Sequence, residues 1–533
     1  MPKVTDKLIQ AYLEPSIPDD GGERIKINEV VAKAALVYEK IRNAVDYQEE
    51  HLIRKNAIYR ILKRKLVYEK AIMENYLLEK YHHENMTEHL LQELIRGGYL
   101  KIGIPRKMID IVDAIIEKYN VILNKSRESE GRISKSTFKS ILQMAAVEIE
   151  ASLIPHKKEK ALINLMFSMV KPKFQIFSEM TEKENDLQIY LACHRTLFKW
   201  DEPMLQYMLM TLYYPGWKTG DPVVVSEIAN TLNKLIEKIN KQINSPWQKK
   251  LVKIMQKKAI IYMVLNDLVE ANGAKSSAVF GDPVLLEAET KKSIIRRSAN
   301  VKVKLRRGVV RSIIYVFFTK MLLALAVEFP MDWYLAGEVN YFSAGINILF
   351  PPFIMFVVAI MIRMPKKENT AKIIEEIKNI ASGAGEGKPI KVLSPISGRK
   401  LVKGFFHLIY FASFLFSLSI IFWFLHGLGF NVFSGLIFVL FLTLVSFFGI
   451  RIRRPVQELM AVDKKDNFIG ALVDFFALPF VSMGRWMSTK FSKVNVIAMF
   501  LDLIIEAPFK LLVEVIEDLL GFFKEKKEDV LIE

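Results

Sequence analysis

Four apolar stretches in the last two fifths of the chain constrain its fold more than any other feature. They cover residues 309–327, 341–362, 405–425 and 428–450. Each is close to the roughly 20 residues that an α-helix needs to cross the hydrocarbon core of a bilayer. The last three contain no Asp, Glu, Lys or Arg, whereas the first carries Arg311 at its edge and Lys320 in its interior. The sequence therefore predicts a four-helix transmembrane region over residues 301–455.

The composition divides the 533-residue chain near residue 300. Hydrophobic residues make up 51% of the chain, which is high for a wholly soluble protein that also carries 25% charged residues. Before residue 300 the sequence is mixed and rich in lysine, and Val30, Ala34 and Val37 recur at helical spacing. No alternating series is long enough for a sheet. We therefore expect an all-α protein, with a flexible N-terminal tail over 1–24 and a cytoplasmic helical domain over 25–300 before the spans.

The charges beside the spans predict their orientation. A run of basic residues without an acid precedes the first span and includes Arg296, Arg297, Lys302, Lys304, Arg306, Arg307 and Arg311. The following loop carries only acids, the inner loop 363–403 is again rich in lysine, and "RIRRP" follows the fourth span. Because Lys and Arg are enriched in cytoplasmic loops, both termini are predicted to lie on the cytoplasmic side of a cytoplasmic membrane. The same basic residues are candidate contacts for anionic lipid headgroups.

Residues 456–533 are apolar but interrupted by charges. Along 502–525 the acids and lysines fall on one side of a helix, and burying them in the bilayer would cost roughly 2.5 to 3.5 kcal/mol each. We therefore expect cytoplasmic amphipathic helices on the membrane surface. For residues 468–484, which contain Asp474, a fifth span is the alternative to an interfacial or re-entrant segment.

Polar residues and prolines inside the predicted spans form a candidate intramembrane site. Lys320 has no acid partner within any predicted span, so we expect it to extend toward Glu328 at the outer interface, with a polar path as the alternative. Pro351 and Pro352 deprive the carbonyls one turn earlier, including that of Asn347, of their helical donors. Transporters use such broken helices to bind ions, although ordinary spans also contain prolines as kinks.

Motifs with catalytic or metal-binding spacing do not emerge from the sequence. "GAGEGKP" at Gly383–Pro389 lacks the hydroxyl residue of a phosphate-binding loop, and the histidines within 82–89 lack the spacing of a metalloprotease helix. Cys193 and His194 are adjacent, so in a helix their side chains point about 100° apart. The sequence therefore predicts no catalytic residues, no metal and no cofactor.

A second basic segment lies in the N-terminal half. "RKNAIYRILKRKLVYEK" contains Arg54, Lys55, Arg60, Lys63, Arg64 and Lys65. Such a helix could contact RNA or an anionic membrane surface, and the alternative is an ordinary solvated helix face.

Together these features favour a non-catalytic integral membrane anchor or scaffold that presents a helical cytoplasmic domain. A small oligomeric transporter or channel and a membrane-tethered nucleic-acid-binding protein are the alternatives. The expected partners are a bilayer with anionic inner-leaflet headgroups, a protein bound to the cytoplasmic domain, and a second copy of the chain. Nucleic acid is the least favoured partner, because topology accounts for much of the net charge of +17.

Overall fold

The structure, a computed structural model, confirms the predicted all-α class. It describes residues 3–14, 22–27, 32–33, 35–37, 39–40, 49–73, 83–131, 133–177, 180–336, 341–383, 389–392, 400–462 and 479–486. Packing divides the chain into two compact units. The membrane unit contains Met1–Ile9, Lys173–Ser178 and Ile254–Asn495, and the helical unit contains Gln10–Pro172, Glu179–Lys253 and Val496–Glu533. Helices α1 (Lys3–Leu13) and α12 (Pro246–Asn272) run across the division.

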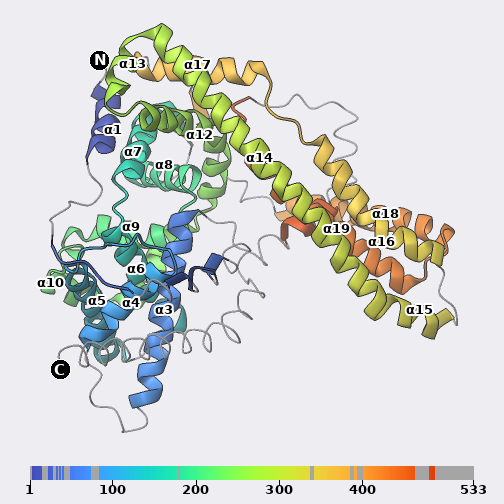
Figure 1. The fold of residues 1–533 in the computed structure, drawn as a ribbon, viewed down its shortest axis with the longest axis horizontal. Coiled ribbons are helices and arrows are strands. Elements are labelled where there is room, and N and C mark those ends of the chain that lie inside the picture. The colour runs from blue at the N-terminus through green and yellow to red at the C-terminus, as the bar shows by residue number, and fades with distance from the viewer. Residues whose placement is uncertain are drawn as a thin grey trace, which may run out of the picture. The chain divides into compact units, whose positions relative to one another are not determined.

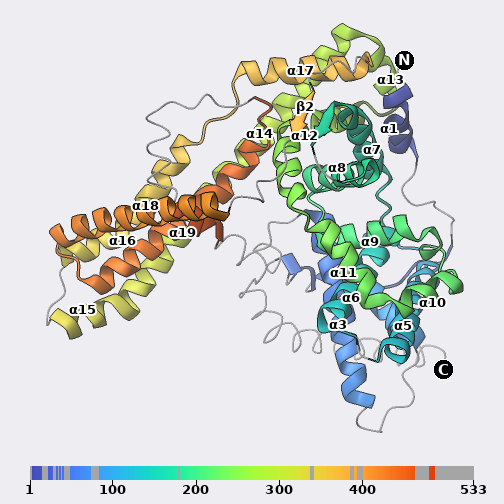
Figure 2. The same ribbon diagram turned by 180° about the vertical axis from the view of Figure 1, so that it is seen from behind.

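The helical unit is a group of helices, most of which contribute buried side chains to one large apolar core (Figures 1 and 2). Its helices are α3 (Glu50–Met73), α4 (His83–Arg96), α5 (Met108–Glu130), α6 (Lys135–Leu153), α7 (Lys157–Val170), α8 (Glu182–Leu197), α9 (Glu202–Tyr213), α10 (Pro222–Asn230) and α11 (Leu232–Ile243). Two 3₁₀ turns, η1 (Lys171–Lys173) and η2 (Pro215–Trp217), lie among them. Helix α6 is central, because it packs against α3, α5, α9 and α11.

Side-chain caps define where several of these helices begin. Asp201 with Pro203 predicts a helix start, and α9 begins there, with the Asp201 side chain accepting a hydrogen bond from the Met204 amide. At α8, Thr181 and Glu184 form a reciprocal capping box. Met204 and Met210 of α9 are buried, and Tyr207 and Met208 are partly buried against the core, whereas Tyr213 is exposed.

The membrane unit contains the long helices of the second half of the chain. After η3 (Gly273–Lys275) and α13 (Ser276–Gly281) come α14 (Pro283–Leu323), the π-helical turn η4 (Ala324–Glu328), α15 (Phe329–Ala336), α16 (Tyr341–Met361), α17 (Lys367–Ala381), α18 (Lys400–Gly427) and α19 (Val432–Gln457). Two three-residue strands, β1 (Phe174–Ile176) and β2 (Ile390–Val392), pair in parallel. The sequence did not predict them.

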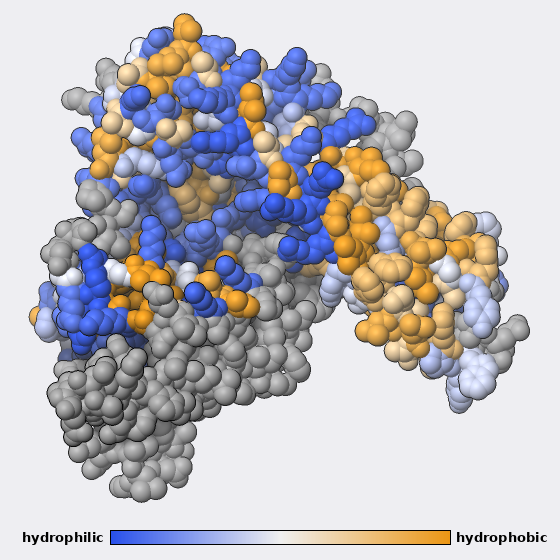
Figure 3. Space-filling model, viewed as in Figure 1, coloured by the Kyte–Doolittle hydropathy of each residue, from blue (hydrophilic) through white to orange (hydrophobic). Residues whose placement is uncertain are grey.

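The four predicted apolar helices are present. Helical segments long and apolar enough to cross a membrane cover Pro283–Met331, Tyr341–Met361, Leu408–Gly427 and Val432–Gln457. Helices α14, α16 and α19 pack against one another, and α18 packs against α19. We call the apolar parts of these four helices, together with η4, the apolar bundle. Hydrophobic side chains cover its visible face, whereas hydrophilic side chains prevail over much of the remaining described surface (Figure 3).

Two boundaries differ from the sequence-based prediction. The turn between the third and fourth apolar helices lies at residues 428–431 rather than at the preceding "HG", because Gly429 adopts a φ of 79° and Asn431 caps α19 at the Ser434 amide. In addition, α14 is a single 41-residue helix of about 60 Å that runs through residue 300. Residue 300, near which the sequence predicts a domain boundary, therefore lies inside a continuous helix. The boundary itself stays a prediction.

The loop 363–403, predicted to be cytoplasmic, contains a folded element, α17, that packs on α14. Lys378 of α17 forms an ion pair with Glu287 of α14 at 2.5 Å. The buried Asn369 side chain donates a hydrogen bond to the Leu459 carbonyl at 2.9 Å and accepts one from the Ala461 amide at 2.7 Å. The loop thus links the first half of α14 to the segment that follows α19.

Residues 479–486 are helical and pack against the middle of α19. A Cβ atom on Gly484 would lie only 2.8 Å from the Phe447 backbone nitrogen, and Met483 Sδ lies 3.8 Å from Thr443 Oγ1. This segment therefore lies alongside the apolar bundle. The amphipathic helices predicted over 502–525, and most of the alternative fifth span, lie outside the described residues.

Candidate polar site within the apolar bundle

Lys320 and Glu328 form a buried ion pair inside the apolar bundle. The Lys320 side chain is 0% exposed and Glu328 is 2% exposed, and the Lys320 ammonium donates a hydrogen bond to Glu328 Oε1. Lys320 points toward Glu328, as expected, but neither side chain reaches the surface of the bundle. A lone charge at mid-bilayer is costly, and pairing with the opposite charge reduces that cost.

The π-helical turn brings the two residues onto one face. In a regular α-helix, residues eight positions apart are offset by about 80°, whereas residues seven apart are offset by only about 20°. A π turn accommodates one extra residue, so positions 320 and 328 are related as positions i and i+7 would be in an α-helix. Pro330 gives a physical reason for this turn, because it has no N–H to donate to the carbonyl of Ala326.

Asn347 of α16 completes the polar site. Its side chain is 1% exposed, and its Nδ2 donates a hydrogen bond to Glu328 Oε2 at 2.6 Å. Among the described residues, Asn347 Oδ1 has no hydrogen-bond partner. The Lys320 ammonium also lies 4.8 Å from the ring centre of Phe441 in α19, within range of a cation–π interaction. The site therefore joins α14, η4, α16 and α19.

The proline pair of the candidate site does not interrupt α16. Pro351 and Pro352 are buried within a helix that continues to Met361. The structure places them one turn beyond Asn347, beside the apolar core cluster that includes Met355 and Val445. Their effect is thus local to the backbone, and the polar side chain of the site on α16 is Asn347.

An apolar cluster fills the bundle between the polar site and its basic end. Val316, Met355, Phe441 and Val445 are each at most 3% exposed and pack together with Ile452. The basic end is marked by the exposed side chains of Lys302, Lys304, Arg306, Arg307 and Arg311 on α14.

The remaining two candidate lipid contacts are near α12. Arg297 forms an ion pair with Asp267 of α12, with 2.7 Å between Nε and Oδ2. Arg296 is exposed and approaches the Asp267 carbonyl at 3.4 Å. Arg297 therefore holds α14 against α12, and its charge is already compensated within the membrane unit.

Basic residues of the second segment, on α3, form ion pairs within the helical unit. Arg54 pairs with Glu150 at 2.8 Å, Arg60 with Glu39 at 2.9 Å, Arg64 with Glu93 at 2.5 Å, and Lys55 with Asp201. Lys63 is exposed, and the side chain of Lys65 lies outside the described residues. Four of its six candidate charges are therefore paired with acids of the same unit, and a contact of this helix with RNA or an anionic membrane surface stays a prediction.

A buried histidine and carboxylate cluster in the helical unit was not anticipated. His156 Nε2 lies 2.6 Å from Glu150 Oε2, and His156 Nδ1 lies 3.1 Å from Glu159 Oε2. Burial by itself would lower the pKa of His156, but hydrogen bonds to Glu150 and Glu159 raise it to about 10. Burial lowers the pKa of the neighbouring His51. His156 and Glu159 lie at the start of α7, Glu150 lies on α6 and His51 on α3, so the full cluster forms only where these helices meet.

Cys193 and His194 are not arranged for catalysis. Both are buried; burial raises the pKa of the Cys193 thiol to about 12 and lowers that of His194 to about 3. Within the described part of the chain, no group of three or more His, Cys, Asp or Glu side chains could hold a metal ion. Most of the Gly383–Pro389 segment lies outside the described residues.

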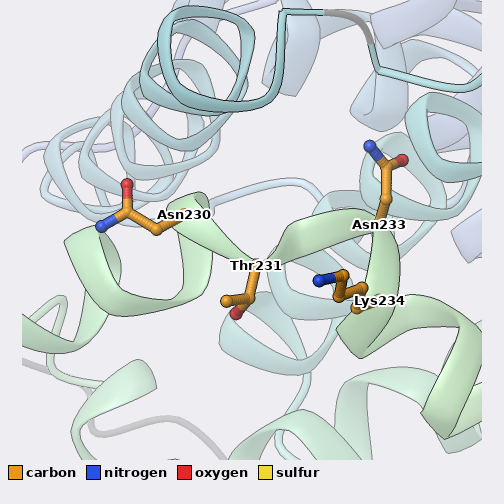
Figure 4. A pocket seen from close by; sticks show the side chains of 4 residues that line it. All are labelled: Asn230, Thr231, Asn233 and Lys234. Atoms are coloured by element: carbon orange, nitrogen blue, oxygen red, sulfur yellow. The ribbon is translucent and has the colours of Figure 1, made fainter.

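A shallow hollow at the junction of α10 and α11 is the pocket visible in the helical unit (Figure 4). It has a volume of about 410 Å³ and is lined by Asn230, Thr231, Asn233 and Lys234. The lining side chains belong to consecutive helical turns and include no titratable pair, so they provide no catalytic arrangement.

Comparison with known protein families, with curated proteins and with solved structures revealed no match to this chain.

Proposed function

We propose that the chain is a non-catalytic integral membrane protein that anchors a helical cytoplasmic unit, acting as a scaffold at the membrane. The observation that carries this proposal is α14, in which a basic, polar half and an apolar, membrane-compatible half form one continuous helix. A continuous helix transmits position and orientation with little flexibility. The partners of such a scaffold are proteins bound to the helical unit.

The proposed topology places both termini in the cytoplasm. The exposed basic residues at one end of α14 and the exposed Arg451, Arg453 and Arg454 near the end of α19 support this orientation. At the opposite end of the bundle, α15 presents exposed Trp333 and Tyr334, residue types that favour the membrane interface.

Anionic headgroups are the proposed lipid partner at the basic end. The exposed charges on α14 comprise Lys302, Lys304, Arg306, Arg307 and Arg311. Each basic side chain close to an anionic leaflet contributes roughly 1 kcal/mol. Arg297 is excluded from this set because it pairs with Asp267.

Cysteine accessibility in intact cells tests the topology. Cys193 is the only cysteine and can be replaced in a Cys193→Ala background. A membrane-impermeant maleimide should label His426→Cys, an exposed position at the α18–α19 turn, without permeabilisation. It should label Lys304→Cys only after permeabilisation. The reverse pattern would contradict the topology, and so would extraction of the full chain by alkaline carbonate.

The non-catalytic assignment has its own test. Purified full-length protein, reconstituted in vesicles, should show no turnover beyond protein-free vesicles in hydrolase and transferase assays. Robust turnover by the native chain would overturn the scaffold assignment while leaving the topology unaffected.

A further inference from the structure

The polar site within the apolar bundle contains an acceptor that the native contacts leave unused. Asn347 is 1% exposed, and while its Nδ2 donates to Glu328 Oε2 its Oδ1 has no partner among the described residues. Leaving a buried acceptor unpaired costs about 1 to 3 kcal/mol. Asn347 Oδ1 can therefore accept one further hydrogen bond within the site.

A carboxamide can form a hydrogen bond with a neighbouring carboxyl group whether that group is ionised or protonated. When Glu328 is ionised, it accepts a hydrogen bond from Asn347 Nδ2, as the structure shows. When Glu328 is protonated, it carries an O–H donor, and rotation of the amide would present Asn347 Oδ1 as its acceptor. Asn347 is thus a suitable partner for Glu328 before and after proton binding.

The polar site lies inside the apolar bundle, away from either end of its helix. Lys320 lies nine residues from Arg311, or roughly 14 Å along the helix, and the apolar cluster of Val316, Met355 and Phe441 packs on this side. In the other direction α15 continues to Ala336, eight residues or about 12 Å beyond Glu328. The helix lengths therefore favour neither end of the bundle as the route for a proton.

We propose that Lys320, Glu328 and Asn347 form a proton-binding site within the apolar bundle. In the empty state the Lys320 ammonium and the Glu328 carboxylate neutralise each other. A proton taken up from water adds to Glu328 Oε2, and Asn347 Oδ1 accepts a hydrogen bond from the new O–H group. The site then carries one net positive charge on Lys320, which the Phe441 ring faces.

Lys320 of α14 is a charged group that faces Glu328, and α16 and α19 contribute Asn347 and Phe441, neither of which titrates. On α15, Asp332 follows Glu328 by four residues, and its side chain lies outside the described residues. We assign the proton uptake to Glu328 because its carboxyl group contacts both Lys320 and Asn347. The inference goes beyond the scaffold function and does not depend on it.

Infrared difference spectroscopy of the reconstituted full chain tests proton binding. We expect a buried carboxyl C=O band that appears as the pH falls and is lost in Glu328→Gln, with about one proton fewer taken up per chain. Lys320→Met should show this band already at neutral pH, because an unpaired carboxylate in an apolar site takes up a proton. Glu375→Gln, at an exposed position on α17, is the matched control and should leave the band unchanged.

Two outcomes would overturn the proposal. One is a native protein with no titrating buried carboxyl band over the pH range in which it stays folded, a result that needs no variant. The other is a buried carboxyl band that persists unchanged in Glu328→Gln, which would place the titrating group at another residue. Membrane insertion and topology would be unaffected by either result, so the anchor proposal is tested separately.

Discussion

Several buried charges among the described residues have a specific partner at close range. Glu150 accepts hydrogen bonds from Arg54 and His156, and Glu328 accepts them from Lys320 and Asn347. Removing one partner from a buried pair typically costs about 3 to 5 kcal/mol, because the other charge stays buried and unpaired. The exposed pairs, such as Lys292 with Glu289, contribute far less.

The His156 cluster makes the stability of the helical unit sensitive to alkaline pH. The pKa of His156 is raised in the folded state to about 10 from its ordinary value of 6.5. Its stabilising contribution is therefore complete below pH 6.5 and is lost as the pH rises through about 10. Pulse proteolysis of the full chain in urea should show a fall in the unfolding free energy on the order of a few kcal/mol across this interval.

His156→Gln should lower the stability at neutral pH and flatten its dependence on alkaline pH, because glutamine carries no proton to lose. The exposed Lys157→Gln, next in the chain, is the matched control and should retain the native profile. If the His156→Gln variant kept the full alkaline sensitivity, the protonated His156 would not be its source.

At the scale of single elements, Pro330 sets the geometry of the polar site. Sequence reasoning placed Lys320, Asn347 and the proline pair in a candidate site and expected Lys320 to extend toward Glu328. The structure adds that Glu328 also accepts a hydrogen bond from Asn347 and so joins these two residues. The sequence ended the first span at Val327 and so assigned Glu328 to a loop. An acid eight residues from a lysine is not a helix-face pair under regular geometry, and only a π turn makes it one.

Pro330→Ala is expected to restore a regular α-helix and rotate Glu328 by about 100° away from Lys320. The bundle should lose about 3 to 5 kcal/mol of stability, as for other broken buried pairs, measured as a fall in the unfolding temperature in detergent. Deleting Ala326 in the Pro330→Ala background should restore much of the loss, because the pair then stands seven residues apart. A deletion that worsens the defect would argue against the π turn as its cause.

The contact between residues 479–486 and α19 depends on the absence of a side chain at position 484. A Cβ atom on Gly484 would lie 2.8 Å from the Phe447 backbone nitrogen, so Gly484→Ala should force the segment away from α19 and lower the unfolding temperature. Gly345→Ala in α16 is the control, because a Cβ there meets nothing within 4 Å. Alanine is the better helix former, so this control should be neutral or more stable by up to about 1 kcal/mol.

For the whole molecule, the sequence predicted the individual helices better than the contacts between elements that are distant in the chain. The apolar runs identified all four bundle helices, since length and hydropathy are local properties. The parallel β1–β2 pair, the ion pairs of α3 and the docking of α17 on α14 were not predicted, because each joins residues distant in the chain. The compositional change near residue 300 coincided with no break in α14.

Asn369 connects α17 to the segment that follows α19 within the membrane unit. Helix α17 packs on the first half of α14, α19 packs on the second half, and Asn369 ties α17 to Leu459 and Ala461 beyond α19. Asn369→Ala leaves buried backbone groups unpaired, at about 1 to 3 kcal/mol each. Hydrogen exchange in α17 should accelerate accordingly. Asn379→Ala on the same helix serves as the control, and equal acceleration in both variants would contradict the role of Asn369.

The pairing of β1 with β2 imposes an order on the biogenesis of the protein. Phe174 pairs with Ile390, so the second strand is synthesised 216 residues after the first (390 − 174). At about 5 to 20 residues per second, β1 waits on the order of 10 to 40 s with its backbone unpaired. The first two apolar helices leave the ribosome during this interval and meet the membrane. Completion of the membrane unit must therefore follow, and cannot guide, the insertion of its first two spans.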